Sequence, residues 1–325
     1  MDNVDGNLFD RDWNNAIYFF FMNADEHIYL RYGGRDAAAA DTYLNMMSLE
    51  LAGKQALELH EKFKKGEINS AAKPTPKYPR EIPMLVQRTF AQNVCVECHL
   101  IGDYINLHRE QDGTLDKLKH MYRSPDIKNI GIMLDVPKGL VVKEALSEVG
   151  VAGMKAGDRI TALNGVPVYT FGDLQYQYDK VDRRAKNMKL TVDRAGQAVE
   201  MTVQLPPRWW WTDLRFRQSS VDTRTYFEDR ALTKEEKQQY GLKADGFASE
   251  VKYVSEIAKT LKSHELKVGD IVYGVNGVES DEFAFTADVY IKLHTTPGDT
   301  ITVNVLRDGK KFDSQLRSFR MSFRK

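Results

Sequence analysis

The feature that most constrains the fold of this chain is a pattern that occurs twice in its second half. Each copy has a Gly-Asp pair before an apolar stretch and an Asn-Gly pair after it. The first copy reads Gly139-Leu140-Val141-Val142, Met154-Lys155-Ala156-Gly157-Asp158-Arg159-Ile160 and Asn164-Gly165-Val166. The second copy reads Gly246-Phe247-Ala248-Ser249, Leu266-Lys267-Val268-Gly269-Asp270-Ile271-Val272 and Asn276-Gly277-Val278. Gly-Asp suits a tight turn before a buried strand, and Asn-Gly supplies the positive φ angles of a hairpin turn. We therefore expect two similar β-rich domains.

Each copy ends in a pair of segments with the alternation of strands, at 188–193 with 198–205 and at 300–306 with 311–316. Arg307-Asp308-Gly309 joins the second pair and is a strong hairpin signal. These motifs resemble the PDZ domain of the circularly permuted bacterial type found in exported proteases and scaffolds. The resemblance covers about residues 127–206 and 236–325 and implies two PDZ-like β-sandwich or barrel domains.

A PDZ domain adds a peptide C-terminus to its sheet as an extra strand and holds the carboxylate with backbone amides of an apolar-Gly-apolar loop. The resemblance places this loop at Ile130-Gly131-Ile132 in the first copy and at Tyr240-Gly241-Leu242 in the second. Protein or peptide C-termini are the partners it implies. The alternative is that segments of the chain itself occupy one or both grooves.

The N-terminal region predicts a hairpin followed by a helix. Strands at 17–22 and 27–32 flank the turn Asn23-Ala24-Asp25-Glu26. A helix starts near Asp41 and stops at Lys64-Lys65-Gly66, with an apolar face formed by Leu44, Met47, Leu51, Ala56 and Leu59. This order resembles the C-terminal half of a thioredoxin-family domain, an α/β segment. The half that carries the C-x-x-C of that family is missing, so packing is the expected role.

Both cysteines of the chain lie in Cys95-Val96-Glu97-Cys98-His99, which has the C-x-x-C-H pattern of covalent haem attachment. Cys95 and Cys98 would form thioether bonds to a haem c, and His99 would bind the iron as the proximal ligand. The segment lies in a short helical block at 82–125, which is too small to cover a haem alone.

Other interpretations of the same five residues stay open. The two cysteines could form a redox-active dithiol or a disulfide, as in a thiol-disulfide oxidoreductase. They could also bind zinc with two further ligands, for which His108 and His120 are the nearest candidates.

The sixth ligand of a haem would decide its chemistry, because methionine or histidine gives an electron carrier and an open position permits ligand binding. Met121 and His120 rank first among the candidates. The other candidates are His108, His60, Met84 and Met133.

Composition excludes several functions. Lys+Arg and Asp+Glu both number 46, so there is no electrostatic signal for nucleic acid. The longest apolar run, at 16–22, is too short to span a membrane and lacks the basic start of a signal peptide.

No G-x-S-x-G, G-N-S-G-G, H-E-x-x-H or phosphate-binding loop occurs, so no protease or hydrolase activity is predicted. Haem attachment would place the protein in the periplasm or another exported compartment.

Proline-rich residues 67–81 read as a linker, and Trp209-Trp210-Trp211 follows Pro206-Pro207 between the two copies. The three tryptophans should pack at an interface or against a cofactor, since exposed indoles would be costly.

We therefore expect an α+β protein with five segments. They are a partial thioredoxin-like segment (1–72), a linker with the helical C-x-x-C-H block (73–126), a first PDZ-like domain (127–206), a Trp-rich linker (207–235) and a second PDZ-like domain (236–325). The leading functional hypothesis is a haem protein for electron transfer or redox sensing that docks peptides or a redox partner protein. The alternatives are a non-haem PDZ scaffold, with the cysteines as a disulfide or zinc site, and a thiol-disulfide oxidoreductase.

Overall fold

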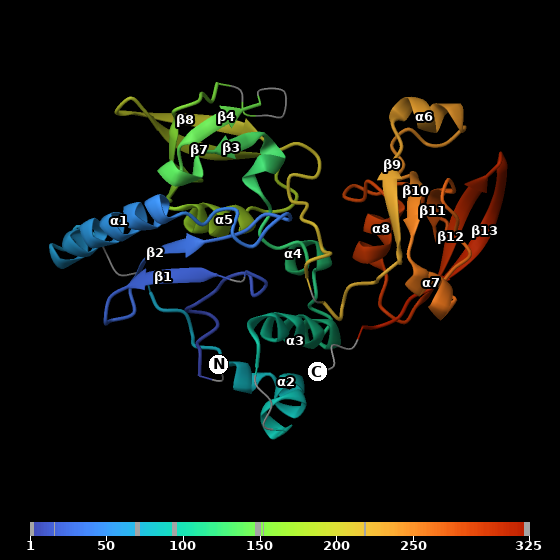
Figure 1. The fold of residues 1–325 in the computed structure, drawn as a ribbon, viewed down its shortest axis with the longest axis horizontal. Coiled ribbons are helices and arrows are strands. Elements are labelled where there is room, and N and C mark those ends of the chain that lie inside the picture. Colours follow the sequence, from blue (N-terminus) through green and yellow to red (C-terminus); the bar gives the residue numbers. More distant parts are fainter. Residues whose placement is uncertain are drawn as a thin grey trace. The chain divides into compact units, whose positions relative to one another are not determined.

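The computed structural model describes residues 3–15, 17–68, 72–92, 96–146, 151, 153–217 and 219–321. The chain divides into two compact units. The first comprises residues 1–108 and 122–218, and the second comprises residues 109–121 and 219–325. Both are mixed α+β with antiparallel sheets, which confirms the expected class (Figure 1).

The predicted N-terminal hairpin is present. Strands β1 (Tyr18–Met22) and β2 (Ile28–Gly33) pair antiparallel, with Phe19 opposite Tyr32. The Asn23 side chain closes the turn, because its oxygen accepts hydrogen bonds from the backbone amides of Asp25 and His27 at 3.0 and 2.9 Å. This is the turn chemistry expected of asparagine.

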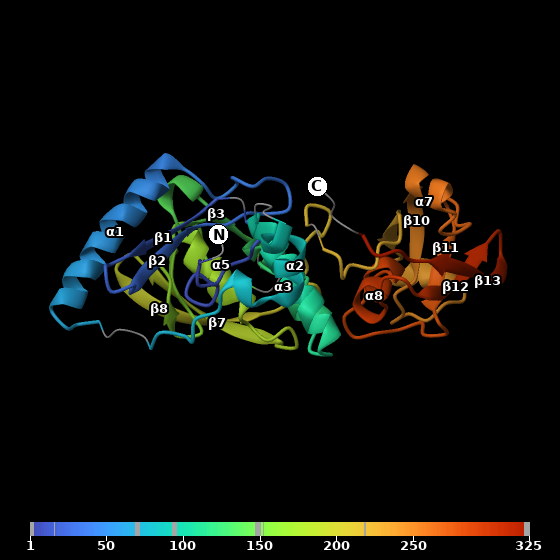
Figure 2. The same ribbon diagram turned by 90° about the horizontal axis from the view of Figure 1, so that it is seen from below.

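Helix α1 (Met46–Lys64) follows the hairpin and begins five residues after the predicted start. Asn45 caps it, accepting a hydrogen bond from the amide of Met47 at 2.9 Å. Ala52, Ala56 and Leu59 pack on the hairpin through Leu30 and Tyr32. Met47 is 64% exposed, so its prediction as part of the apolar face is wrong. Figure 2 shows α1 alongside β1 and β2.

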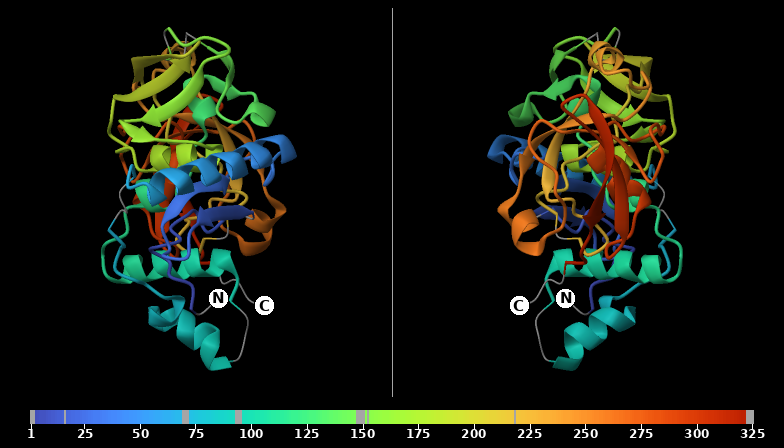
Figure 3. Two further views of the ribbon diagram at one scale, coloured as in Figure 1. Left: turned by 90° about the vertical axis from the view of Figure 1, so that its left-hand side faces the viewer. Right: turned by 90° about the vertical axis from the view of Figure 1, so that its right-hand side faces the viewer.

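The helical block after the linker consists of short elements and one longer helix. They are the 3₁₀ turn η1 (Pro79–Glu81), α2 (Pro83–Arg88), the 3₁₀ turn η2 (Phe90–Gln92), α3 (Cys98–Gln111) and α4 (Lys117–His120). Helices α2 and α3 lie on the opposite side of the hairpin from α1 (Figure 3). Residues 109–121, which include α4, belong to the second unit.

In its described residues, the first repeat contains a four-stranded sheet, a separate strand pair, one α-helix and two 3₁₀ turns. Its elements are η3 (Ile127–Ile130), β3 (Ile132–Leu134), η4 (Val136–Lys138), β4 (Val142–Ala145), β5 (Arg159–Leu163), β6 (Val166–Pro167), α5 (Phe171–Asp179), β7 (Asn187–Arg194) and β8 (Gln197–Gln204). The sheet order is β6-β5-β7-β8, and β3 pairs with β4. Asn164 and Gly165 have φ angles of 48° and 78°, as the hairpin signal required.

The second repeat has one five-stranded sheet in the order β13-β12-β11-β10-β9. Its elements are β9 (Phe227–Ala231), α6 (Lys234–Gln239), β10 (Ser249–Val254), α7 (Glu256–Leu261), β11 (Ile271–Val275), α8 (Ala287–His294), β12 (Thr300–Arg307) and β13 (Lys310–Arg317). Strand β9 lies within the segment expected to be a linker. The predicted turn between β12 and β13 is confirmed, with φ angles of 51° at Asp308 and 77° at Gly309.

The aspartate of the Gly-Asp pair forms the same type of ion pair in both repeats. Asp158 forms a bidentate ion pair with Arg194 at the end of β7, with both contacts at 2.8 Å. Asp270 forms the equivalent pair with Arg307 at the end of β12, with both contacts at 2.6 Å. Each pair links the turn before a central strand to the next strand of the sheet, which explains why the aspartate recurs.

Candidate functional site

The C-x-x-C-H motif is described from Val96 onward, and Cys95 lies outside the described residues. Cys98 and His99 are the first two residues of α3. The helix starts because the carbonyl of Glu97 accepts hydrogen bonds from the amides of Leu100 and Ile101 at 3.1 and 3.3 Å. The motif therefore opens a helix of 14 residues.

A guanidinium group lies beside the sulfur of Cys98. Arg11 donates a hydrogen bond from Nη2 to Cys98 Sγ at 3.2 Å, and its guanidinium carbon lies 4.8 Å from the ring centroid of Trp13. Trp13 packs on α3 at Gly102, where an added Cβ would come within 2.9 Å of Trp13 Cβ. Residues 11–13 thus hold the start of α3, and the cation and the helix N-terminus both interact favourably with negative charge on sulfur.

The two imidazole nitrogens of His99 have different surroundings. Nε2 lies 2.5 Å from Oε2 of Glu97, and Nδ1 is buried with no hydrogen-bond partner among the described residues. The donor types suit a c-type haem, and the unpaired Nδ1 is consistent with a missing group. Iron binding through Nε2, however, would require the imidazole to leave Glu97.

The predicted sixth ligands belong to the other compact unit. His120 Nδ1 accepts a hydrogen bond from the Asp116 amide at 3.1 Å, and Met121 follows at the end of α4 and is 3% exposed. Both lie in the second unit, whereas His99 lies in the first. Their role as haem ligands stays a prediction. Among the described residues, no group of three or more His, Cys, Asp and Glu side chains is placed to hold a metal ion.

The loop predicted for the first repeat lies where the resemblance requires it, directly ahead of β3. Gly131 has a φ of 82°, and Ile130 and Ile132 on either side are fully buried. The amide of Gly131 already donates to the carbonyl of Lys128 at 2.9 Å. Peptide binding here stays a prediction.

Residues 31–43 pack along α5. The backbone amide of Arg31 donates to Asp173 at 2.9 Å and its carbonyl accepts from Thr170, while Gln175 donates to the carbonyl of Arg35 at 2.9 Å. Helix α5 is therefore covered by β2 and the residues that follow it.

The same segment reaches the residues ahead of β3. The ring of Tyr43 stacks on that of Phe171 in α5, and its hydroxyl donates to Asp126 at 2.7 Å. Lys128 pairs with Asp36 at 2.9 Å. Tyr43 and Asp36 thus contact α5 and the residues around η3. Occupation of the peptide groove by the chain itself stays a prediction.

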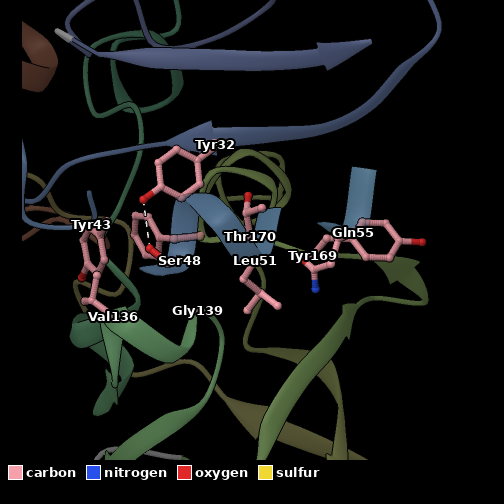
Figure 4. A pocket seen from close by; sticks show the side chains of 10 residues that line it. Tyr32, Tyr43, Ser48, Leu51, Gln55, Val136, Gly139, Tyr169 and Thr170 are labelled. Carbon is pink, nitrogen blue, oxygen red and sulfur yellow. Dashed lines mark hydrogen bonds between the residues drawn. The ribbon is translucent and has the colours of Figure 1, made fainter. Parts of the chain in front are cut away.

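A small cavity lies under α1 (Figure 4). Its volume is about 10 Å³, and it is bounded by α1, β2, η4 and the start of α5. The hydroxyl of Tyr32 is 2.9 Å from that of Ser48 at its edge. This space is about that of one water molecule and holds no peptide side chain.

The tryptophans after Pro207 pack within the first unit. Trp209 and Trp210 are 2% and 3% exposed. Asn129 donates to the carbonyls of Trp209 and Trp211 at 3.0 and 2.7 Å, and Tyr178 in α5 donates to the carbonyl of Trp209 at 3.3 Å. The packing interpretation accounts for the burial of both rings.

In the second repeat, Tyr240-Gly241-Leu242 follows α6 in the connection from β9 to β10. This segment is therefore not directly ahead of β9, the first strand of the repeat. Its prediction as the carboxylate-binding loop rested on that position. That position holds Thr225-Tyr226-Phe227, where Tyr226 has a φ of 58°. The sequence hid this loop because a tyrosine stands where the first repeat has Gly131, and α6 lengthens the following connection.

No described helix has both the length and the apolar character that crossing a bilayer demands. No protein-family model matches the sequence. The chain is 30% identical over 145 residues to the periplasmic serine endoprotease DegP of Salmonella typhimurium, covering 44% of this chain and 27% of that protein. It is 34% identical over 126 residues to the periplasmic pH-dependent serine endoprotease DegQ of Escherichia coli, covering 38% and 25%.

The chain therefore spans about a quarter of the length of these curated relatives. Among solved structures, the chain matches a serine-to-alanine variant of the HtrA-type protease AlgW with a decapeptide. The TM-score is 0.29 and the sequence identity 16%, and the match covers 56% of this chain and 54% of that chain. AlgW with a tripeptide matches with a TM-score of 0.29 and 15% identity over 57% and 60%. The chain thus has a distant similarity to HtrA/DegP-type periplasmic proteases, which contain PDZ domains.

Proposed function

We propose that this chain is an exported thiol-redox protein in which Cys95 and Cys98 exchange a disulfide with a partner protein. The observation that carries the proposal is the hydrogen bond from Arg11 to Cys98 Sγ at the first residue of α3. The thiolate is the reactive form of cysteine, and Arg11 donates a hydrogen bond directly to the sulfur that would attack. The periplasmic location of the relatives supports an exported compartment, where disulfide chemistry is common.

The reaction would be a balanced two-electron exchange. One thiolate of the motif attacks a disulfide of the partner protein, forming a mixed disulfide and releasing one partner thiolate. The second cysteine then displaces the other partner sulfur. The partner disulfide is reduced to two thiols, and the motif is oxidised to a Cys95–Cys98 disulfide.

The remaining parts of the chain would serve as scaffold in this proposal. The two repeats are PDZ-like, and the N-terminal hairpin and helix form the partial thioredoxin-like segment. The packing of residues 31–43 over α5 favours a structural role for the first repeat over capture of peptide C-termini.

Thiol titration and insulin reduction test the proposal directly. The full chain should show two thiols after reduction, lose both on treatment with glutathione disulfide, and reduce insulin. Cys95→Ser and Cys98→Ser should each abolish insulin reduction. An inactive parent chain whose thiols stay free in glutathione disulfide would reject the proposal.

A c-type haem is the second candidate, favoured by the unpaired, buried Nδ1 of His99 within C-x-x-C-H. Cys95 and Cys98 would hold the porphyrin and His99 the iron, and the haem would supply one-electron transfer. Expression with a cytochrome c maturation system, followed by a pyridine haemochrome spectrum, separates the candidates. A covalent-haem spectrum would support the haem and exclude the dithiol, since both sulfurs would be consumed. Metal analysis of the same sample identifies the zinc alternative.

A further inference from the structure

A cavity of about 500 Å³ lies between the N-terminal segment and the proline-rich linker of the first unit. This volume is in the range of sites that hold small ligands. Its apolar wall includes Phe9, Pro76 and Tyr78, and its charged lining side chains are Asp5, Glu26 and Lys73. The redox proposal uses none of these residues, so the cavity needs its own explanation.

Hydrogen bonds hold the two sides of the cavity together. The amide of Gly6 donates to the carbonyl of Lys77 at 2.7 Å. The side-chain nitrogen of Asn7 donates to the carbonyl of Thr75 at 2.8 Å. The N-terminal segment and the linker are therefore bonded to each other directly, and the space between them belongs to the fold of the first unit.

The carboxylate of Asp5 has a fixed orientation in this lining. Its Oδ1 accepts hydrogen bonds from the amides of Asn7, Leu8 and Lys77 at 2.9, 3.2 and 3.1 Å. Its Oδ2 accepts none from the residues that the structure describes. A group that is already held in place loses little conformational entropy when a ligand binds. Asp5 can therefore offer Oδ2 to a donor in the cavity at low cost.

The chain's own Lys73 shows which kind of group the cavity accepts. Its ammonium lies 2.9 Å from Oε2 of Glu26, and the two side chains are 56% and 52% exposed. An ion pair this exposed contributes little to stability, so another cation can replace the lysine easily. Two lining carboxylates and one ammonium also leave one negative charge in excess.

The aromatic wall favours the same chemistry. The guanidinium carbon of Arg80 lies 5.6 Å from the ring centroid of Tyr78, and such a ring attracts cations. Phe9 and Pro76 add carbon surface on which an alkyl chain can pack. Lysine side chains combine these two properties, since a carbon chain carries the ammonium group.

We propose that this cavity binds an alkylammonium group, carried by a free amine or by a lysine side chain of a peptide. The ammonium takes the place of Lys73 beside Glu26, and Asp5 supplies the second carboxylate. The carbon chain packs on the apolar wall. Lys73 is then an internal competitor of the ligand, and its removal should strengthen binding. The site is independent of the redox proposal, because no cysteine takes part in it.

Calorimetric titration of the full chain with diaminopentane and with the amide of the tripeptide Gly-Lys-Gly tests the site. At constant ionic strength, at least one of these amines should bind. Pentanol, which has the carbon chain without the charge, should not bind measurably. Binding of the peptide alone assigns the site to lysine side chains, and binding of diaminopentane alone assigns it to free amines. The absence of binding by both amines, or equal binding of pentanol, would overturn the proposal.

Two variants with opposite expected effects place the ammonium in the cavity. Glu26→Gln should weaken binding about two- to fivefold, and Lys73→Gln should strengthen it by a similar factor. Both side chains are more than half exposed, so neither change should prevent folding.

Lys189→Gln and Glu200→Gln are the matched controls. These residues form an ion pair of 2.8 Å on β7 and β8, with side chains 58% and 57% exposed. Each control should leave the affinity of the parent chain unchanged. The proposal is overturned if Glu26→Gln and Lys73→Gln behave like these controls.

Discussion

Asp12 and Arg217 lie 205 residues apart and form a buried bidentate ion pair, with oxygen–nitrogen distances of 2.8 and 2.5 Å. Arg217 also donates to the carbonyl of Arg123 at 2.8 Å. The neighbour of Asp12, Arg11, reaches Cys98. The N-terminal segment therefore connects α3 to the segment after the tryptophans within the first unit.

Arg217→Ala should destabilise the first unit by about 3–5 kcal/mol, because it leaves the Asp12 carboxylate buried and unpaired. Arg215→Ala is the control, since its side chain is 75% exposed in its pair with Asp213. That change should cost less than about 1 kcal/mol. Urea unfolding followed by tryptophan fluorescence measures both, and equal losses would contradict the assigned importance of the buried pair.

The same pair predicts a dependence on pH. Burial raises the pKa of Asp12, but the attraction and hydrogen bonds of Arg217 outweigh it and hold the pKa well below the usual range. The pair thus stabilises the fold above the ordinary carboxyl pKa, and this stability is lost as the pH falls through acid values. Asp12→Asn should reduce the loss of stability between about pH 7 and pH 3 measured by urea unfolding. An unchanged slope would argue against the pair as its source.

The contact between α5 and β2 can be tested with one methyl group. A Cβ at Gly172 would lie 2.8 Å from the carbonyl oxygen of Arg31, so Gly172→Ala should destabilise the chain by about 1–3 kcal/mol. Gly53→Ala in α1 is the matched control, since nothing lies within 4 Å of its added Cβ. It should stabilise the chain by about 0.5–1 kcal/mol, as alanine favours helix. Thermal unfolding distinguishes these opposite signs.

The guanidinium beside Cys98 should control the reactivity of its sulfur. In a Cys95→Ser background, Cys98 is the sole cysteine. There, Arg11→Gln should slow alkylation by iodoacetamide at pH 7 by about threefold or more, because the thiolate loses its cationic partner. Arg80→Gln, which removes a guanidinium that lies over Tyr78, is the control and should leave the rate unchanged. Identical rates in both variants would show that Arg11 has no influence.

The sequence alone determined the elements whose causes are local. Four turns form where the residue types favour them. They lie at Asn23, Asn164-Gly165, Asn276-Gly277 and Asp308-Gly309. The duplicated Gly-Asp pattern likewise implied two similar domains, and the structure supplies its reason in the Asp158–Arg194 and Asp270–Arg307 ion pairs. Short-range backbone preferences and repeated side-chain spacing carry this information.

Tertiary structure alone decided what each motif faces. No local signal shows that Arg11 reaches Cys98, that Tyr43 stacks on Phe171, or that Thr225 bonds Asp288. The segment directly ahead of β9, Thr225-Tyr226-Phe227, was not recognised from the sequence, because Tyr226 adopts a φ that glycine usually provides. These relationships depend on contacts between residues tens to hundreds of positions apart. Packing and burial select such contacts, and the order of residues along the chain does not record them.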